Sequence, residues 1–197
     1  MTATSISKAI AVAVAIAIWS PVSMAQSTGT PLPSAKQTKL GKYATASEVP
    51  ALLATERSKT VFIDTRTRGE LQFVGVPSGI DAHVPYAEMN EFGEWDAKAG
   101  RYKVDLNSSF GSEVERVLQR KGLGKSDRVL LICRSGDRSA KAADLLAKLG
   151  YTNVFSITDG FEGDLSKDGR RTINGWKNAG LPWSYKLDPA QAYRPQR

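Results

Sequence analysis

Residues Arg128–Ser139 have the sequence Arg-Val-Leu-Leu-Ile-Cys-Arg-Ser-Gly-Asp-Arg-Ser, which is the strongest indication of the fold. After Arg128, its residues 129–132 form an apolar run, which is typical of a strand buried on both faces. Residues 139–149 carry an apolar stripe at helical spacing, and Gly150 is a natural end for that helix. The pattern therefore predicts a buried strand followed by an amphipathic helix, with Cys133 at the carboxyl end of the strand.

Two further apolar runs, at Thr60–Asp64 and Asn153–Ile157, predict strands of the same kind. Helical patterns occupy residues 112–121 and 47–53. Buried strands that alternate with amphipathic helices predict an α/β fold, in which a parallel sheet has helices on both faces. Residues 95–102 interrupt the pattern with turn residues between aromatics, and there we expect an extra hairpin or loop.

The N-terminus has the features of a secretory signal peptide over residues 1–25. Lys8 precedes an apolar run at 9–19, and small residues at Ser23 and Ala25 predict cleavage after Ala25. The run is shorter than the ~20 residues that a membrane-spanning helix needs. An uncleaved N-terminal anchor is the alternative.

The rest of the chain divides into three expected parts. Residues 26–42 are rich in small and polar residues and predict a flexible leader. The folded domain is expected over 43–187, with a C-terminal tail at 188–197.

The composition restricts the chemistry. A single Cys excludes an internal disulfide and any site made of several cysteines, and a single His excludes a His-rich metal site. The sequence contains no P-loop and no dinucleotide fingerprint. We therefore expect no cofactor and no metal. The net charge of +7 mildly favours anionic partners, but nothing in the sequence predicts nucleic-acid binding.

The loop after the predicted strand is suited to hold an anion beside the Cys133 thiol. Backbone N–H groups can curl around one anion there, Gly136 allows the necessary dihedral angle, and the helix N-terminus adds positive potential. Ser139 is expected to be the N-cap of the helix. A thiol in this setting should be largely thiolate at neutral pH. The candidate anion-binding residues are Arg134, Ser135, Gly136, Asp137 and Arg138.

These features together resemble the rhodanese-like sulfurtransferases. The resemblance rests on the order of the Cys133 loop and several flanking motifs, and it spans about residues 43–185. The flanking motifs are Asp64-Thr65-Arg66 with Glu70, Ala82-His83-Val84-Pro85-Tyr86, Gly150-Tyr151-Thr152-Asn153-Val154, and Asp159-Gly160 with Trp176.

The resemblance implies a central parallel sheet of about five strands and a sulfurtransferase activity. Cys133 would accept a sulfane sulfur as a persulfide from a donor such as thiosulfate, and a cyanide or thiol acceptor would remove it. The expected partners are thus a small sulfur-containing anion and this acceptor, with a periplasmic partner protein as a further option. The expected location is the periplasm, with no membrane contact after signal cleavage.

The supporting residues have different expected roles. Asp64 and Arg66 should fix a turn near the loop, and Arg138 should brace the loop through a carboxylate. Arg134 has two equally favoured roles, contact with the donor or solvation. His83 is expected to be structural rather than catalytic. An inserted stretch at 164–174 is expected to rim the site and select the acceptor.

Two alternatives to the enzyme remain. One is a sulfur carrier or binding module that forms the persulfide without turnover. The other is phosphate- or arsenate-directed chemistry. It is less favoured, because related phosphatases place five residues between Cys and Arg, whereas four separate Cys133 from Arg138. Within the family resemblance, Asp137 is a departure from the most basic loops, and its negative charge bears on whether thiosulfate is the specific donor.

Overall fold

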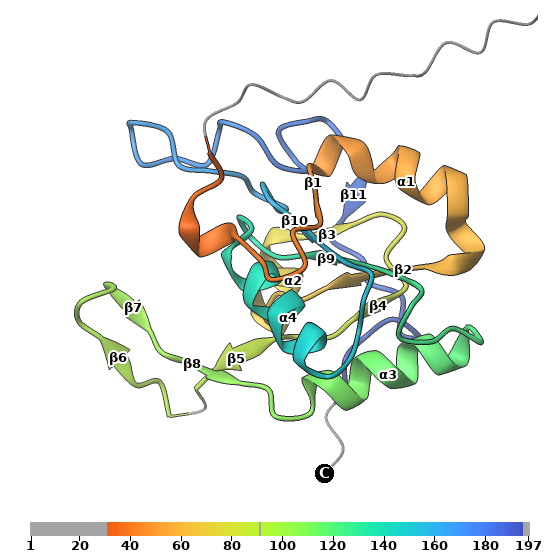
Figure 1. Cartoon of the computed structure of the whole chain (residues 1–197). Coiled ribbons are helices and arrows are strands. Elements are labelled where there is room, and N and C mark those ends of the chain that lie inside the picture. The colour runs from red at the N-terminus through yellow and green to blue at the C-terminus, as the bar shows by residue number, and fades with distance from the viewer. Residues whose placement is uncertain (1–30, 91, 195–197) are drawn as a thin grey trace, which may run out of the picture. The chain divides into compact units, whose positions relative to one another are not determined.

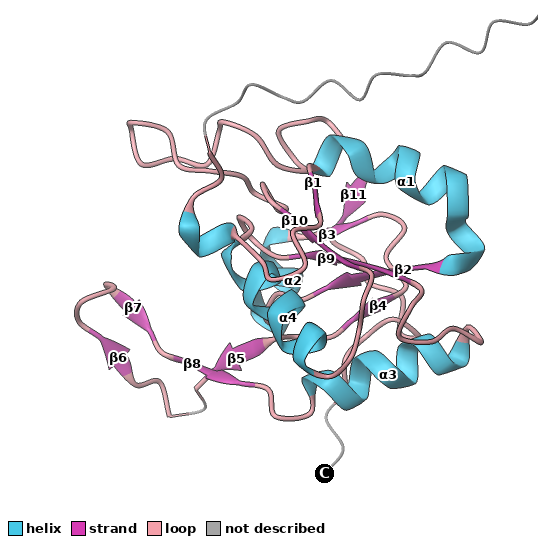
Figure 2. Ribbon diagram, in the orientation of Figure 1, coloured by secondary structure: helices cyan, strands magenta, loops and turns pink. Residues whose placement is uncertain are grey.

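A five-stranded parallel sheet lies at the centre of the computed structural model, which describes residues 31–90 and 92–194 (Figures 1 and 2). Its strands lie in the order β1, β10, β9, β2, β4, and every neighbouring pair is parallel. Their bounds are Tyr43–Ala44, Val154–Ile157, Arg128–Ile132, Thr60–Asp64 and Ala82–His83. The predicted α/β fold with a central parallel sheet of five strands is confirmed.

Helices cover both faces of this sheet, as the sequence predicted (Figure 2). Alternate residues of β2 and β9 point to opposite faces, and both faces exclude water. Val61, Ile63 and Leu131 belong to the core that includes buried residues of α3 and α4. Phe62 and Leu130 belong to the opposite core, which includes residues of α1 and α2. The helices span Val49–Glu56 (α1), Arg68–Val74 (α2), Phe110–Arg120 (α3) and Asp137–Lys148 (α4).

Helix α4 begins earlier than the sequence predicted. Gly136 is its N-cap, with a φ of +102°, and Asp137 is its first residue. The prediction that Ser139 caps this helix is therefore wrong, and Ser139 lies inside the first turn. The positive φ of Gly136 ends the loop at that residue, and glycine adopts such a φ readily because it has no Cβ.

The described part of the expected leader lies against the domain. Residues Ser34–Lys36 form a short 3-10 helix (η1), and the Lys36 ammonium pairs with Asp164 at 2.6 Å. The backbone N–H of Lys39 donates to Asp144 in α4. The expected signal peptide, residues 26–30 and the last three residues of the expected tail lie outside the described residues.

The described part of the tail runs along the edge strand β4. The carbonyl of Gln191 accepts the backbone N–H of His83 at 2.7 Å, and its side chain donates to the carbonyl of Ile80. These bonds satisfy groups that the sheet edge would otherwise leave unpaired.

Three antiparallel pairs complete the strands of the described chain. Their members are β3 (Val76–Pro77) with β11 (Trp183–Ser184), β5 (Ala87–Met89) with β8 (Val104–Leu106), and β6 (Trp95–Asp96) with β7 (Arg101–Tyr102). The extra hairpin expected at 95–102 is thus β6–β7. We call residues 87–106 the arm; Glu91 within it is not described. The arm extends away from the central sheet (Figure 1).

Two short 3-10 helices flank α1, at Ala46–Glu48 (η2) and Arg57–Lys59 (η3). In the inserted stretch, a single antiparallel bridge joins Leu165 to Arg171. Among the residues that the structure describes, no helix is both long and apolar enough to cross a membrane.

Candidate active site

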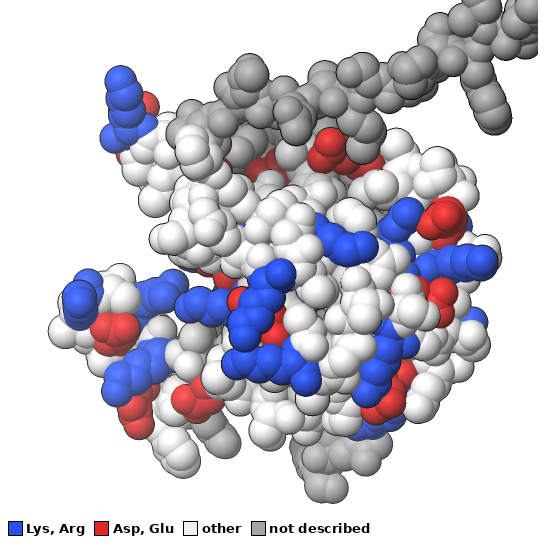
Figure 3. All heavy atoms as spheres, in the orientation of Figure 1, with Lys and Arg blue, Asp and Glu red and all other residues white. Residues whose placement is uncertain are grey.

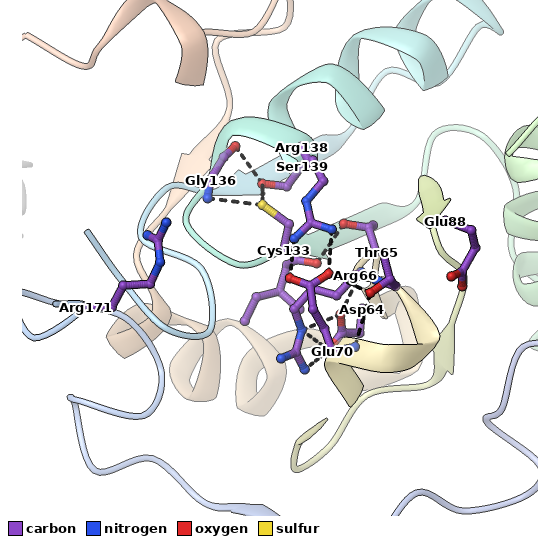
Figure 4. Close-up of polar contacts among 12 residues, drawn as sticks. Asp64, Thr65, Arg66, Glu70, Glu88, Cys133, Gly136, Arg138, Ser139 and Arg171 are labelled. Carbon is purple, nitrogen blue, oxygen red and sulfur yellow. Dashed lines mark hydrogen bonds and ion pairs between the residues drawn. The ribbon is translucent and has the colours of Figure 1, made fainter. Parts of the chain in front are cut away.

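The Cys133 thiol lies directly after β9, at the carboxyl edge of the sheet, where open α/β sheets form their sites. The residue is 1% exposed. Its Sγ accepts the backbone N–H of Gly136 at 3.1 Å and lies 3.5 Å from the Ser139 hydroxyl (Figure 4). One backbone amide and one hydroxyl therefore already face the sulfur atom.

Two buried hydroxyls lie next to each other beside the sulfur. The Ser139 hydroxyl donates to the carbonyl of Gly136 at 2.9 Å and also lies 2.9 Å from the Ser156 hydroxyl of β10. Both serines are fully buried. A rotation of the Ser139 hydroxyl would direct its proton at a negatively charged sulfur, while Ser156 remains beside it.

The segment after β10 fixes the backbone of the loop from outside. The carbonyl of Cys133 accepts the N–H of Phe161 at 2.8 Å, and that of Arg134 accepts the N–H of Glu162 at 2.9 Å. A side chain on Gly136 would collide with the carbonyl of Thr158, and one on Gly160 would collide with the loop backbone. The loop therefore packs backbone against backbone, which holds its shape without a ligand.

Arg138 pairs with Glu70 of α2 rather than pointing freely into solvent. Its guanidinium donates two hydrogen bonds to the carboxylate, at 2.7 and 2.5 Å. Thr67 donates its N–H and hydroxyl to the same carboxylate, as the cap of α2. Glu70 is the carboxylate partner expected for the Arg138 brace, and the pair joins the start of α4 to α2.

The charges of this pair stabilise each other strongly. Burial on its own raises the pKa of Glu70, but the hydrogen bonds and charge of Arg138 outweigh it, and the pKa falls from 4.5 to about 2. Burial on its own lowers the pKa of Arg138, but the hydrogen bonds and charge of Glu70 raise it above its ordinary value. Both groups are therefore ionised throughout the physiological range.

Asp64 and Arg66 form a second ion pair beneath the loop. Both side chains are fully buried, and the guanidinium lies 2.6 Å from the carboxylate. Arg66 also donates to the carbonyl of Gly75 and lies over the Phe161 ring, 4.0 Å from its centroid. Neither charged residue is among those that line the cavity at Cys133. Their position fits the expected turn-fixing role, and Phe161 is a supporting residue that the sequence analysis missed.

Arg134 is half-buried at the rim of the loop. Burial lowers the pKa of its guanidinium, and the nearby positive charge of Arg171 lowers it further. Its Nε is buried and has no hydrogen-bond partner among the described residues. Arg171, from the inserted stretch, lies across the loop from Arg138 (Figure 4).

A cavity of about 550 Å³ opens over the thiol. Of the expected loop residues, Arg134, Ser135, Asp137 and Arg138 line it with Cys133, whereas Gly136 and Ser139 support the sulfur from below. Most of the cavity wall consists of residues that were not predicted from the sequence. The missed lining residues are Thr67, Val74, Tyr86, Ala87, Met89, Arg101, Tyr102, Val104, Leu106, Lys141 and Glu162.

The arm, and not the inserted stretch, forms the outer wall of this cavity. Of the described residues, none from 164–174 lines it. The stretch folds back on itself through the Leu165–Arg171 bridge, and Arg171 donates to the carbonyl of Gly163. The expectation that residues 164–174 rim the site therefore differs from the structure, although the charge of Arg171 acts on Arg134 in the loop.

His83 lies away from the sulfur and has a structural environment. Its Nε2 is 2.7 Å from the carbonyl of Arg66, and burial lowers its pKa. The neutral ring is therefore favoured and donates to that carbonyl, which agrees with the expected structural role.

The described domain is thus an α/β domain with a cysteine-containing loop at the carboxyl edge of a parallel sheet. Residues 45–167 match the family model described as the rhodanese-like domain. This chain therefore belongs to the rhodanese-like family.

The chain is also similar to curated proteins and to a solved structure whose names state no family. The Rickettsia rickettsii protein named "Uncharacterized protein RP600 homolog" is 32% identical over 123 residues, which are 62% of this chain and 81% of that protein. RP600 of Rickettsia prowazekii is 31% identical over the same shares of both chains. The crystal structure of Rv0390 from M. tuberculosis is 29% identical with a TM-score of 0.55, over 74% of this chain and all of that one.

Proposed function

We propose that this protein is a sulfurtransferase that moves a sulfane sulfur through a persulfide on Cys133. The observation that carries the proposal is the position of Sγ, which lies at the floor of the cavity and accepts the Gly136 amide. A sulfur atom bound there as an anion would extend into the space above the loop.

The first half-reaction uses a donor such as thiosulfate. The Cys133 thiolate attacks the outer sulfur of the donor, the S–S bond of thiosulfate breaks, and sulfite leaves with the electron pair. Cys133 then carries one additional sulfur as a persulfide anion. Arg134 and Lys141 line the cavity and supply positive charge for the anionic donor.

The second half-reaction returns the enzyme to its starting state. Cyanide or a thiolate attacks the outer sulfur of the persulfide, and the bond to Sγ breaks. The electron pair stays on Sγ, which is again a thiolate. No step requires a general base when cyanide or a thiolate is the acceptor. This is consistent with the environment of His83, the one His of the chain, whose Nε2 bonds the Arg66 carbonyl.

We also propose that the mature protein is periplasmic, exported by the N-terminal signal and cut after Ala25. The support is the sequence of residues 1–25 alone. N-terminal sequencing of the exported protein tests this proposal, and a product that still begins at Met1 contradicts it.

Steady-state kinetics with thiosulfate and cyanide test the proposed activity. Parallel double-reciprocal lines are expected, because the two substrates react in separate half-reactions. Cys133→Ser should fall to the background rate, whereas Ser112→Ala, at an exposed position of α3, should retain full activity. Persulfide formation without turnover would favour the carrier alternative. Faster hydrolysis of p-nitrophenyl phosphate would favour the phosphate-directed alternative.

A further inference from the structure

The arm presents one apolar face beside the thiol. In its β5–β8 part, Ala87 pairs with Leu106 and Met89 with Val104, and all four line the cavity. The pair between them, Glu88 with Asp105, points to the other face, since side chains alternate along a strand. The strand register therefore places the apolar side chains towards Cys133 and the acidic ones away from it.

The apolar face continues beyond the cavity onto the β6–β7 hairpin. Tyr102 lines the cavity, and Trp95 packs edge-to-face on it with ring centroids 5.3 Å apart. Trp95 itself lies outside the cavity lining. A small anion at the thiol would therefore leave this outer part uncovered.

These apolar side chains of the arm lie on one surface and face water. Met89, Trp95 and Tyr102 are each more than half exposed. Leu106 is 69% exposed. Two-stranded hairpins are marginally stable by themselves, and a contiguous exposed apolar patch indicates an interaction surface.

The charges around this face favour an acidic partner. Arg101 of the arm and Lys141 of α4 line the cavity and are exposed, and within the described part of the chain neither forms an ion pair. Lys and Arg side chains gather over α4, whereas basic and acidic side chains are mixed over the β6–β7 hairpin (Figure 3). Asp137 and Glu162 are the carboxylates that oppose them in the cavity lining, together with the Glu70 that Arg138 neutralises.

We propose that the arm is a docking surface for a protein acceptor, in which a cysteine thiol sits beside apolar and acidic side chains. This inference rests on the proposed function and specifies the class of acceptor for its second half-reaction. The thiolate of the partner attacks the outer sulfur of the Cys133 persulfide, and the S–S bond to Sγ breaks. The electron pair returns to Sγ, and the partner leaves as a persulfide. The exchange conserves sulfur and electrons and needs no added oxidant.

Two synthetic cysteine peptides of equal length and charge test this proposal. In one peptide, leucines and glutamates flank the cysteine; in the other, serines replace the leucines. Sulfur transfer from thiosulfate to each peptide is followed by mass spectrometry and expressed as kcat/KM. We expect the wild type to prefer the leucine peptide at least tenfold, since aromatic anchors dominate such contacts.

Variants locate the source of that preference. Trp95→Ser should reduce it to less than threefold and leave turnover with cyanide unchanged. Leu106→Ser, nearer to the thiol, should lower the preference in the same way. Ile173→Ser is the matched control, because Ile173 is 61% exposed but belongs to the inserted stretch. It should keep the full preference.

Each contrary result has a distinct meaning. Equal use of both peptides by the wild type overturns the docking proposal, and so does an equal loss of preference in Trp95→Ser and Ile173→Ser. A dimer that Trp95→Ser converts to a monomer assigns the face to a second copy and also overturns it. Failure of the proposed function has a different readout from failure of the docking proposal, because the wild type would then show no turnover with cyanide.

Discussion

Replacing Glu70 by glutamine should destabilise the domain, because the largely buried Arg138 guanidinium loses its negatively charged partner. Both side chains are about four-fifths buried, at 18% and 22% exposure. A pKa lowered from 4.5 to about 2 corresponds to about 3–4 kcal/mol at about 1.4 kcal/mol per unit. Loss of one partner from a buried ion pair typically costs about 3–5 kcal/mol. We therefore expect Glu70→Gln to lower the free energy of unfolding at pH 7 by about 3 kcal/mol.

The pH dependence of this effect follows from the direction of the shift. Folding lowers the pKa of Glu70, so the unfolded chain binds the proton first as the pH falls below about 4.5. The contribution of the pair is complete above that pH and is lost towards pH 2. At pH 3 the difference between wild type and Glu70→Gln should be about 2 kcal/mol smaller than at pH 7.

Urea unfolding at pH 7 and at pH 3, at constant ionic strength, measures both quantities. Glu88→Gln is the matched control, because the Arg68–Glu88 pair has a guanidinium that is 57% exposed. This control should cost less than about 1 kcal/mol. Equal losses in the two variants, or a Glu70→Gln loss that is the same at both pH values, would show that the Glu70–Arg138 pair does not supply this stability.

Three further predictions concern the loop and its support. Gly136→Ala should cost at least ~2 kcal/mol in urea unfolding, since its Cβ would meet backbone at a φ of +102°; Gly169→Ala, with open space around it, should cost about 1 kcal/mol. Ser139→Ala should slow alkylation of Cys133 by iodoacetamide severalfold at pH 7, because the thiolate loses the hydroxyl that can donate to it. An unchanged rate contradicts this role of the Ser139 hydroxyl. Burial lowers the pKa of His83, so wild-type stability should fall as the pH drops below about 6.5, and His83→Gln should abolish that fall, as unfolding followed between pH 7 and 5.5 will check.

The core of the fold could be predicted because three of the five strands of its sheet are largely apolar runs. Residues 60–64, 128–132 and 153–157 have no polar face, which only a doubly covered parallel sheet accommodates. The position of Cys133 followed directly, since the residue after such a strand must lie at its carboxyl edge. Its loop could be placed for the same reason.

The start of α4 and the cavity wall depended on features that local sequence does not carry. The helix begins at Asp137 because Gly136 adopts a positive φ, which its packing against Thr158 favours. The partnership of Arg138 with Glu70 joins residues 68 positions apart. The resemblance to the family named Glu70, but spacing alone did not pair it with Arg138.

The place of the arm beside the thiol could not be predicted from the sequence. Strands β5 and β8 have only three residues each, which is too short for a clear alternating pattern. Only their pairing reveals that Met89 and Val104 share the face towards the thiol. The aromatic residues at 95 and 102 were a visible signal of a hairpin, but not of its place at the site.

The mass of the whole protein before and after treatment with thiosulfate shows whether Cys133 takes up a sulfur atom. The wild type should gain one sulfur atom, a thiol reductant should remove it, and Cys133→Ser should gain none. An unchanged wild-type mass, or the same gain in Cys133→Ser, would contradict the claim that Cys133 carries the sulfur.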